Sequence, residues 1–258
     1  MKIIVMVKEV PDTWGERKLH LETGLATRDA GESVLDEIGE RGVEVALTHR
    51  DENAGTEVVL LSMGPESAST TLRKGLAMGA DRAIHVVDEA LHGADLGTTA
   101  QVLAAAIRRE GFDLVIAGNV STDGSGGVVP SMVAELLGVP ALTGLGALAI
   151  SNTEVKGQRI CEDGVRDVVA PLPAMISITE ALPDARFPNF KGIMSAKKKP
   201  LETLTTADLA VNVEDESRAR SIVIAVSERP ARAAGIKIVD EGDAGEKLAE
   251  FLVSARLA

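Results

Sequence analysis

The sequence predicts an α/β protein built on a mostly parallel, doubly wound sheet, with an antiparallel hairpin and an extended C-terminal arm appended to it. The apolar runs Ile3–Val7, Glu57–Met63 and Asp113–Ala117 are nearly continuous, which is typical of parallel strands covered on both faces. Segments of helical period separate these runs, as parallel neighbours require. Beyond Pro140 the segments become short and alternating, and beyond Pro183 the periodicity weakens.

Strands and helices alternate through the first half of the chain. The helix expected over Leu96–Arg108 follows Asp95, a residue type that caps helix N-termini, and Gly111 ends it. Gly64 and Pro65 together end the second predicted strand. The other elements expected here are the helices Ser33–His49, Glu66–Met78 and Val129–Leu137 and the strand Ala83–Val87.

The second half of the chain follows a different pattern. Turn residues separate three alternating segments, Ala147–Ile150, Glu154–Cys161 and Val165–Val169, which predict an antiparallel hairpin, and Ala174–Thr179 predicts a further strand. From Pro183 we expect little regular structure until a short amphipathic helix over Ala244–Ala255. We therefore divide the chain into an α/β domain, residues 1–182, and a segment, residues 183–258, that we expect to lie on another subunit.

Composition excludes several classes of partner. The chain has 258 residues, 45% of them hydrophobic, and a formal charge of −12 that repels nucleic acid and anionic lipid. Four Phe, one Trp and no Tyr leave few rings on which bases could stack. The lone Cys161 excludes an internal disulfide, and the four histidines show no metal-ligand spacing. We expect no nucleic acid and no metal.

Targeting and membrane signals are not seen in the sequence. The opening residues MKIIVMVKEV form a strand-like run that is shorter than the apolar core of a signal peptide. No stretch approaches the roughly 20 apolar residues that a membrane span requires. We therefore expect a cytoplasmic protein without membrane insertion.

Three polar or glycine-rich segments follow predicted strands, namely Lys8–Asp12, Ser62–Pro65 and Asn119–Gly127. Ligands of open parallel sheets bind at these carboxyl ends. The third segment is rich in glycines and hydroxyls but has no Lys, Arg or His, which disfavours a Walker-type triphosphatase. Its glycines allow close approach of a ligand, and the amides of the following helix favour an anion. The sequence therefore predicts a nucleotide that is bound and not cleaved.

Each of these features also has a structural interpretation. The glycine-rich loop is either a binding loop or a plain connection, and Ser62–Pro65 is either a ligand contact or a strand stop. Asp123 is either an acceptor for a ribose or a turn carboxylate, and Lys8 is either a ligand contact or a solvated strand end. The Lys197–Lys199 run is either a docking patch or a solvated face. No nucleophile–base pattern is visible, so we assign no catalytic residue.

Four segments resemble the beta subunit of electron-transfer flavoproteins. They are VKEVPDT (7–13), SMGPESASTTLRKGLAMGADRAIHV (62–86), DLVIAGNVSTDGSGGVVPSMVAELLGVP (113–140) and ARFPNFKGIMSAKKKP (185–200). The similarity runs in order along nearly the whole chain, and the STDG form of the loop is similar to that of bacterial members. The resemblance implies an adenine-nucleotide alpha-hydrolase-like fold and a carrier subunit that is not itself an enzyme.

The same resemblance implies cofactors and binding residues. It implies a heterodimer with an alpha subunit that holds most of the redox FAD, while the beta subunit binds AMP or, in electron-bifurcating members, a second FAD. By motif alignment, the residues implied to bind this nucleotide are Met6, Lys8, Asp36, Glu37, Ile38, Gly39, Met63, Asn119, Val120, Ser121, Thr122, Asp123, Gly124, Ser125, Gly126 and Gly127.

The resemblance also implies partners and a route for electrons. Flavin dehydrogenases, such as the acyl-CoA dehydrogenases of fatty acid oxidation, would donate electrons, and a membrane quinone oxidoreductase would accept them. Residues 183–258 would contain a dehydrogenase-recognition loop, with Phe190, Lys197, Lys198 and Lys199, followed by an arm on the alpha subunit. Phe190 is either an anchor for the partner or a core residue. The alternative function is that of a universal-stress-type nucleotide-binding regulator with no redox role.

Overall fold

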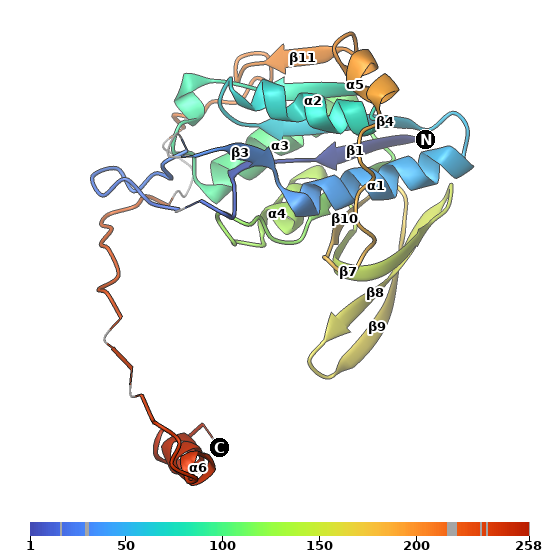
Figure 1. The fold of residues 1–258 in the computed structure, drawn as a ribbon. Helices are drawn as coiled ribbons and strands as arrows, with labels where there is room; N and C mark the ends of the chain where they lie inside the picture. The colour runs from blue at the N-terminus through green and yellow to red at the C-terminus, as the bar shows by residue number, and fades with distance from the viewer. Residues whose placement is uncertain (16, 29–30, 216–220, 233, 236, 258) are drawn as a thin grey trace. The chain divides into compact units, whose positions relative to one another are not determined.

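A nine-stranded sheet runs through the first part of the chain, with the strand order β11-β5-β4-β1-β6-β10-β7-β8-β9 (Figure 1). Every neighbouring pair from β11 to β7 is parallel, whereas β8 and β9 continue the sheet antiparallel. The strands are β1 Lys2–Met6, β4 Glu57–Met63, β5 Arg82–Val86, β6 Leu114–Gly118, β7 Ala141–Ile150, β8 Glu154–Cys161, β9 Gly164–Pro171, β10 Ala174–Ile178 and β11 Leu201–Leu204. A separate antiparallel pair joins β2 Glu9–Pro11 to β3 Ser33–Leu35.

The computed structural model describes residues 1–15, 17–28, 31–215, 221–232, 234–235 and 237–257. The chain divides into two units, Met1–Ala225 and Val226–Ala258. The helices are α1 Glu37–Glu52, α2 Ala68–Met78, the 3-10 turn η1 Glu89–Leu91, α3 Leu96–Glu110, α4 Val129–Leu137, α5 Phe190–Ala196 and α6 Ala244–Ser254.

Helices cover both faces of the sheet in the first unit. Side chains of β1 alternate between the two resulting cores: Ile3 and Val5 belong to the core with α1 and α2, and Ile4 belongs to the core with α3 and α4. All three are fully buried, which explains why the strand is a continuous apolar run. The predicted mostly parallel, doubly wound α/β fold is confirmed.

Helix α3 begins where the sequence predicts it, whereas α1 begins later. Asp95 caps α3, since its carboxylate accepts a hydrogen bond from the Thr98 amide at 2.8 Å. The expected helix over Ser33–His49 instead begins at Glu37, because Ser33–Leu35 pairs with β2 and the buried Asp36 stands at the N-cap. The strand Ser33–Leu35 has only three residues, too few to show the alternation of a strand. Its apolar residues therefore matched the helical period of the residues that follow.

The predicted hairpin is a three-stranded ribbon. β7 pairs parallel with β10 over its first half, shifts register near Leu145, and then pairs antiparallel with β8. β8 in turn pairs with β9 along its full length, from Glu154 to Cys161. One strand therefore belongs both to the parallel sheet and to the ribbon.

The segment after residue 182 contains more structure than the sequence predicts. α5 packs on α2, and β11 pairs parallel with β5 at the edge of the sheet, so both elements belong to the first unit. The expected division at residue 182 therefore does not coincide with the two units. At seven and four residues, α5 and β11 are too short for periodicity to reveal.

The second unit ends in α6, which has no buried residue. Leu248, Phe251 and Val253 on this helix are 55%, 48% and 65% exposed. An amphipathic helix of this length has little stability in water without a surface to cover its apolar face. That the segment 183–258, which includes this helix, lies on another subunit stays a prediction.

Lys199 serves the fold itself. Its ammonium group donates hydrogen bonds to the carbonyl oxygens of Leu76, Gly79 and Ala80, at 3.0, 3.0 and 2.6 Å. These carbonyls lie at and just after the C-terminal end of α2, where Leu76 also accepts the Gly79 amide and Gly79 also accepts a guanidinium nitrogen of Arg50. Burial lowers the pKa of Lys199. Of the three lysines predicted to meet a partner, Lys197 and Lys198 are exposed, whereas the ammonium group of Lys199 binds the fold itself.

We expect Lys199→Met to destabilise the protein by about 1–3 kcal/mol, because the Ala80 carbonyl loses its donor and the carbonyls of Leu76 and Gly79 each lose one of two. Urea unfolding followed by circular dichroism measures this change. The matched variant Lys198→Met removes the same charge from an exposed neighbour and should stay within about 0.5 kcal/mol of wild type. Equal stability of the two variants would show that the helix cap contributes nothing.

Candidate functional site

The three predicted strand ends meet at one edge of the sheet. β1 lies between β4 and β6, with Met6 opposite Leu61 and Val5 opposite Ile116. Chain order reverses here, because β4 and β5 follow β1 on one side while β6 and β10 follow on the other. Such a reversal point opens the crevice in which doubly wound proteins bind ligands. The predicted convergence of these segments is confirmed.

The glycine-rich loop, residues 119–127, connects β6 to α4. It turns tightly, since the amide of Ser125 donates to the carbonyl of Ser121 at 3.1 Å. Ser125 has a φ of 52° and Gly127 a φ of 65°, so both lie in the left-handed region of backbone conformation. Glycine adopts this region without strain, but serine does not. These contacts and backbone angles give the loop a tight, defined turn.

Close contact places the start of α1 against the glycine-rich loop. A Cβ atom on Gly118 would overlap the side chain of Ile38, so only glycine fits at this position. The contact also brings Asp36 to the loop, where its Oδ2 accepts the amide of Thr122 at 3.0 Å. This explains how residues 36–39 and 119–127, far apart in the sequence, form one site.

Three cations reach the loop from the segment after β1. The ammonium of Lys8 lies 2.6 Å from Asp123 Oδ1, and a guanidinium nitrogen of Arg28 lies 3.5 Å from Asp123 Oδ2. Arg17 donates to the carbonyl oxygens of Thr122 and Pro11. The sequence prediction included Lys8 but missed Arg17 and Arg28, since no strand or helix pattern places residues 12–32 near the loop.

The two carboxylates at the loop have opposite pKa shifts. Burial raises the pKa of Asp36, which is 2% exposed, and it outweighs the hydrogen bond from the Thr122 amide. Burial also opposes ionisation of Asp123, but the hydrogen bond and charge of Lys8 outweigh it and lower the pKa of Asp123. Asp123 is therefore the firmly anionic member of the pair.

Two polar atoms beside the loop lack a partner within the described residues. They are Oδ1 of Asp36 and Oγ1 of Thr122, both buried. A buried polar atom without a hydrogen bond costs about 1–3 kcal/mol. A buried acceptor next to the glycine-rich loop fits a ligand that offers a hydrogen-bond donor, such as a nucleoside.

The remaining predicted residues line the same edge with different exposure. Met6 and Met63 pack against the core of α3 and α4, and Gly39 is buried beside Val7. Asn119 accepts the amide of Val120 through its side chain. The other predicted nucleotide residues with exposed side chains or backbone are Glu37, Val120, Gly124, Ser125, Gly126 and Gly127.

The predicted docking residues lie elsewhere on the first unit. α5 rests on the C-terminal half of α2, as a Cβ atom on Gly192 would overlap the carbonyl of Ala77. The C-terminus of α2 leads into the start of β5, so α5 lies near the N-terminal ends of the parallel strands. The glycine-rich loop lies at their C-terminal ends. Phe190 is 79% exposed, which excludes the core interpretation.

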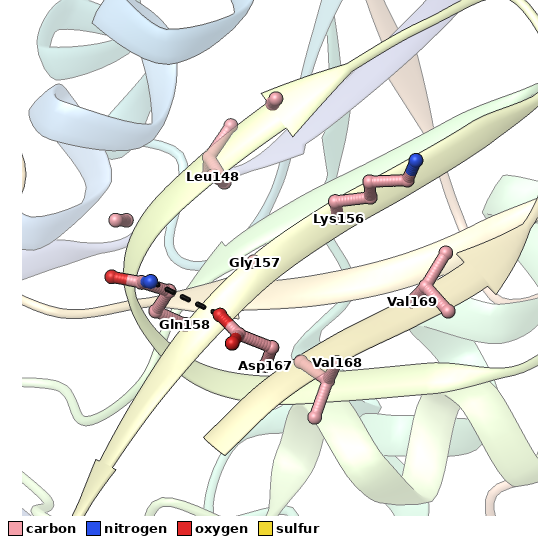
Figure 2. A pocket seen from close by; sticks show the side chains of 9 residues that line it. Leu148, Lys156, Gly157, Gln158, Asp167, Val168 and Val169 are labelled. Carbon is pink, nitrogen blue, oxygen red and sulfur yellow. Dashed lines mark hydrogen bonds between the residues drawn. The ribbon is translucent and has the colours of Figure 1, made fainter. Parts of the chain in front are cut away.

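A hollow of about 480 Å³ opens on the ribbon and not at the loop (Figure 2). Its lining is mostly apolar, with Leu148, Val168 and Val169 beside a hydrogen bond of 3.0 Å between Gln158 and Asp167. Lys156, its one cation, pairs with Glu154 at 2.8 Å. The donor side chains Lys156 and Gln158 of the hollow therefore already pair with carboxylates, which disfavours an anionic ligand.

No group of three or more potential metal-ligating side chains occurs among the described residues. Nor does any helix of the described chain combine the length and apolar character that crossing a membrane demands.

Comparisons with known proteins agree on one family. The family model described as electron transfer flavoprotein domain matches residues 24–209. The electron transfer flavoprotein subunit beta of Mycobacterium leprae is 45% identical over 99% of this chain and 98% of its own length. The protein of the same name from Bacillus subtilis is 35% identical over 83% of each chain. The caffeyl-CoA reductase-Etf complex subunit CarD of Acetobacterium woodii is 37% identical over 83% of this chain and 82% of its own.

We expect Gly118→Ala to destabilise the protein by about 1–3 kcal/mol, because the added methyl group forces Ile38 away from the loop. Chemical unfolding monitored by circular dichroism tests this. In the matched variant Gly126→Ala the new Cβ would meet only the Leu96 side chain at 3.9 Å, so stability should change by less than about 0.5 kcal/mol. If Gly118→Ala is as stable as Gly126→Ala, the contact does not hold α1 against the loop.

Proposed function

Because this chain belongs to the electron transfer flavoprotein family, as a beta subunit, we propose that it passes electrons as one half of a heterodimer while keeping an adenine nucleotide in its own glycine-rich loop. Members of this family are electron carriers and not enzymes, and a beta subunit implies an alpha partner. The family assignment sets aside the universal-stress-type regulator. In the proposed route, flavin dehydrogenases donate electrons, FAD held mainly by the alpha subunit carries them, and a membrane quinone oxidoreductase accepts them.

The residues of the loop fit an adenine nucleotide, and the buried acceptor on Asp36 is the observation that carries this proposal. Asp36 Oδ1 and Thr122 Oγ1 would accept and donate hydrogen bonds to the ribose or the base. Loop amides and the cations Lys8 and Arg28 would face the phosphate end. When bound, FAD supplies electron-carrying chemistry, whereas AMP supplies none.

The loop is suited to retention and not to turnover of the nucleotide. Lys8 is held by Asp123 at 2.6 Å and by Ser121 at 3.5 Å, so its ammonium group lies in a fixed position that neutralises the loop. Asp36 ties the loop to the start of α1 through the Thr122 amide. These contacts stabilise one loop conformation. The loop therefore loses less conformational entropy when a nucleotide binds.

Two exposed apolar surfaces fit protein partners. On α5 and the residues before it, Phe187, Phe190, Ile193 and Met194 are 94%, 79%, 47% and 52% exposed. Such a cluster, with Lys197 and Lys198 next to it, fits a dehydrogenase surface that offers an apolar pocket with acidic surroundings. On α6, the exposed Leu248, Phe251 and Val253 fit the alpha subunit. We expect the complex to be cytoplasmic.

Co-expression with the alpha subunit encoded in the same organism tests the proposed function. We expect a stable 1:1 complex with the visible absorbance of flavin, because most of the flavin environment lies on the alpha subunit. Removing residues 244–258 should weaken this complex and leave the circular dichroism of the isolated chain nearly unchanged, since α6 buries no residue of its own. A pair of chains that neither associate nor retain flavin would contradict the proposal.

We expect Phe190→Ala to slow electron transfer from a partner dehydrogenase by about thirtyfold at limiting concentration, because an anchor residue contributes about 2 kcal/mol to docking. Dye reduction assayed with an acyl-CoA dehydrogenase measures this rate. Flavin content, nucleotide content and thermal stability should stay near wild type, since the side chain is exposed. Leu136→Ala, which shortens an exposed apolar residue on α4, is the matched control. Equal rates for the two variants would place docking elsewhere.

A further inference from the structure

Residues 183–189 form a stretch without helix or strand that leads from β10 to α5 and crosses α1 on the way (Figure 1). Among the described residues, no hydrogen bond joins the backbone of residues 183–188 to another backbone group. Ala185 packs against the core with α1 and α2, but Phe187, two residues later, is 94% exposed. Contacts made by side chains therefore determine where this stretch lies.

Arg186 binds the stretch to α1. Its Nε and Nη2 donate to Oε2 and Oε1 of Glu44 at 2.8 and 2.9 Å, and its backbone amide donates to the same Oε2 at 3.0 Å. Its Nη1 donates to Asp51 Oδ2 at 2.8 Å. Glu44 and Asp51 lie two turns apart on one face of α1. One side chain thus joins the stretch to two carboxylates of the same helix.

The pair of Arg186 and Glu44 is better placed than an ordinary surface ion pair. Two parallel N–H groups of the guanidinium bind one carboxylate, which is the geometry of the stronger ion pairs. The Glu44 side chain is only 16% exposed, so water and salt screen the pair less. Burial opposes ionisation of Glu44, but the hydrogen bonds from Arg186 outweigh it and lower the pKa of Glu44. The pair therefore stays ionised at neutral pH.

A second contact from α1 is weaker. Arg41 reaches Asp184 and the carbonyl oxygen of Leu182. The Asp184 side chain is 88% exposed, so water screens this ion pair. Arg186 is therefore the stronger attachment, and it directly precedes Phe187.

Helix α2 holds the other end of the exposed apolar cluster on α5 and the residues before it. Arg73 on α2 donates to the carbonyl oxygens of Ala196 and Lys199, at 2.8 and 2.7 Å. The cluster thus lies between an attachment to α1 at Arg186 and attachments to α2 after α5. A segment that is ordered before it meets a partner loses less conformational entropy on docking.

We propose that Arg186 is a positioning residue for dehydrogenase docking, because its bonds to Glu44 and Asp51 fix the stretch that carries Phe187 and leads into Phe190. The proposal rests on the proposed function, in which the exposed apolar cluster meets a dehydrogenase. Arg186 acts through the cluster and does not itself contact the partner.

The test varies the concentration of the purified heterodimer as electron acceptor of an acyl-CoA dehydrogenase, with dye reduction as the readout. Arg186→Gln should raise the KM for the heterodimer about three- to tenfold, because the stretch must then be ordered during docking. The kcat should stay within about twofold of wild type, since the docked complex keeps the same contacts. Glu44→Gln should raise the KM as Arg186→Gln does, because it removes the other half of the same attachment.

A double-mutant cycle separates positioning from direct contact with the partner. In a heterodimer that already carries Phe187→Ala and Phe190→Ala, Arg186→Gln should change the KM by less than about twofold, because no anchor remains to be positioned. An equal fold-change of Arg186→Gln in both backgrounds overturns the proposal. A wild-type KM for Glu44→Gln overturns it as well, since Arg186 would then act without α1.

Hydrogen exchange of the heterodimer measures the order of the stretch without a dehydrogenase. Peptides that span residues 182–194 should exchange faster in Arg186→Gln than in wild type. The matched control is Arg109→Gln, which breaks an ion pair of 2.8 Å between Glu202 and a residue of α3, on the other face of the sheet. It should leave the exchange of these peptides and the KM unchanged.

Thermal unfolding checks the fold of each variant. If Arg186→Gln is unfolded, the combination of Arg186→Gln and Glu44→Gln takes its place, because it leaves no unpaired carboxylate at residue 44.

The outcomes distinguish this proposal from the proposed function. If replacing Phe187 and Phe190 leaves the KM unchanged, the proposed docking surface fails, and hydrogen exchange alone decides the role of Arg186. Faster exchange in the folded variant then supports the ordering of the stretch by Arg186, and unchanged exchange overturns it. If the two Phe replacements raise the KM but Arg186→Gln does not, the docking surface stands and the role of Arg186 is overturned.

Discussion

The pairing of β1 between β4 and β6 is the constraint on which the rest of the first unit depends. Chain order reverses between β1 and β6, so the helices that follow these strands pack on opposite faces and leave a crevice at the strand ends. Gly118, at the end of β6, lets α1 approach this crevice closely. As a result Lys8, Asp36 and Asp123 meet, although more than eighty residues separate Asp123 from either of the others.

Burial opposes ionisation of both carboxylates at this crevice, and the paired Lys8 outweighs it at Asp123. Asp36 has an acceptor without a partner in the described chain, and its pKa is raised by burial, so a ligand that donates a hydrogen bond would relieve a real cost. Asp123 binds the ammonium of Lys8 and the amide of Gly124, and these contacts stabilise the loop without a ligand. The exposed apolar side chains of α5 lie at the opposite edge of the sheet. The proposed nucleotide site and the proposed docking surface therefore share no residue.

The sequence predicts the long elements well and the short ones poorly. Continuous apolar runs and helical periods predicted β4 and α4 at their observed bounds, because each contains enough residues to define a pattern. β2, β3, α5 and β11 are too short to do so, and they form because tertiary packing holds them. The loop itself was predictable from its glycines and its place after a strand. Arg17, Arg28 and the cap formed by Lys199 were not, since each depends on contacts across the fold.

Identifying the bound small molecules tests most directly whether the loop at the reversal point keeps an adenine nucleotide. The heterodimer is purified without added nucleotide, denatured, and its released small molecules are quantified by mass spectrometry. We expect one AMP or one second FAD for each complex in addition to the flavin of the alpha subunit. A complex with full flavin content and normal absorbance that releases no second nucleotide would contradict the account.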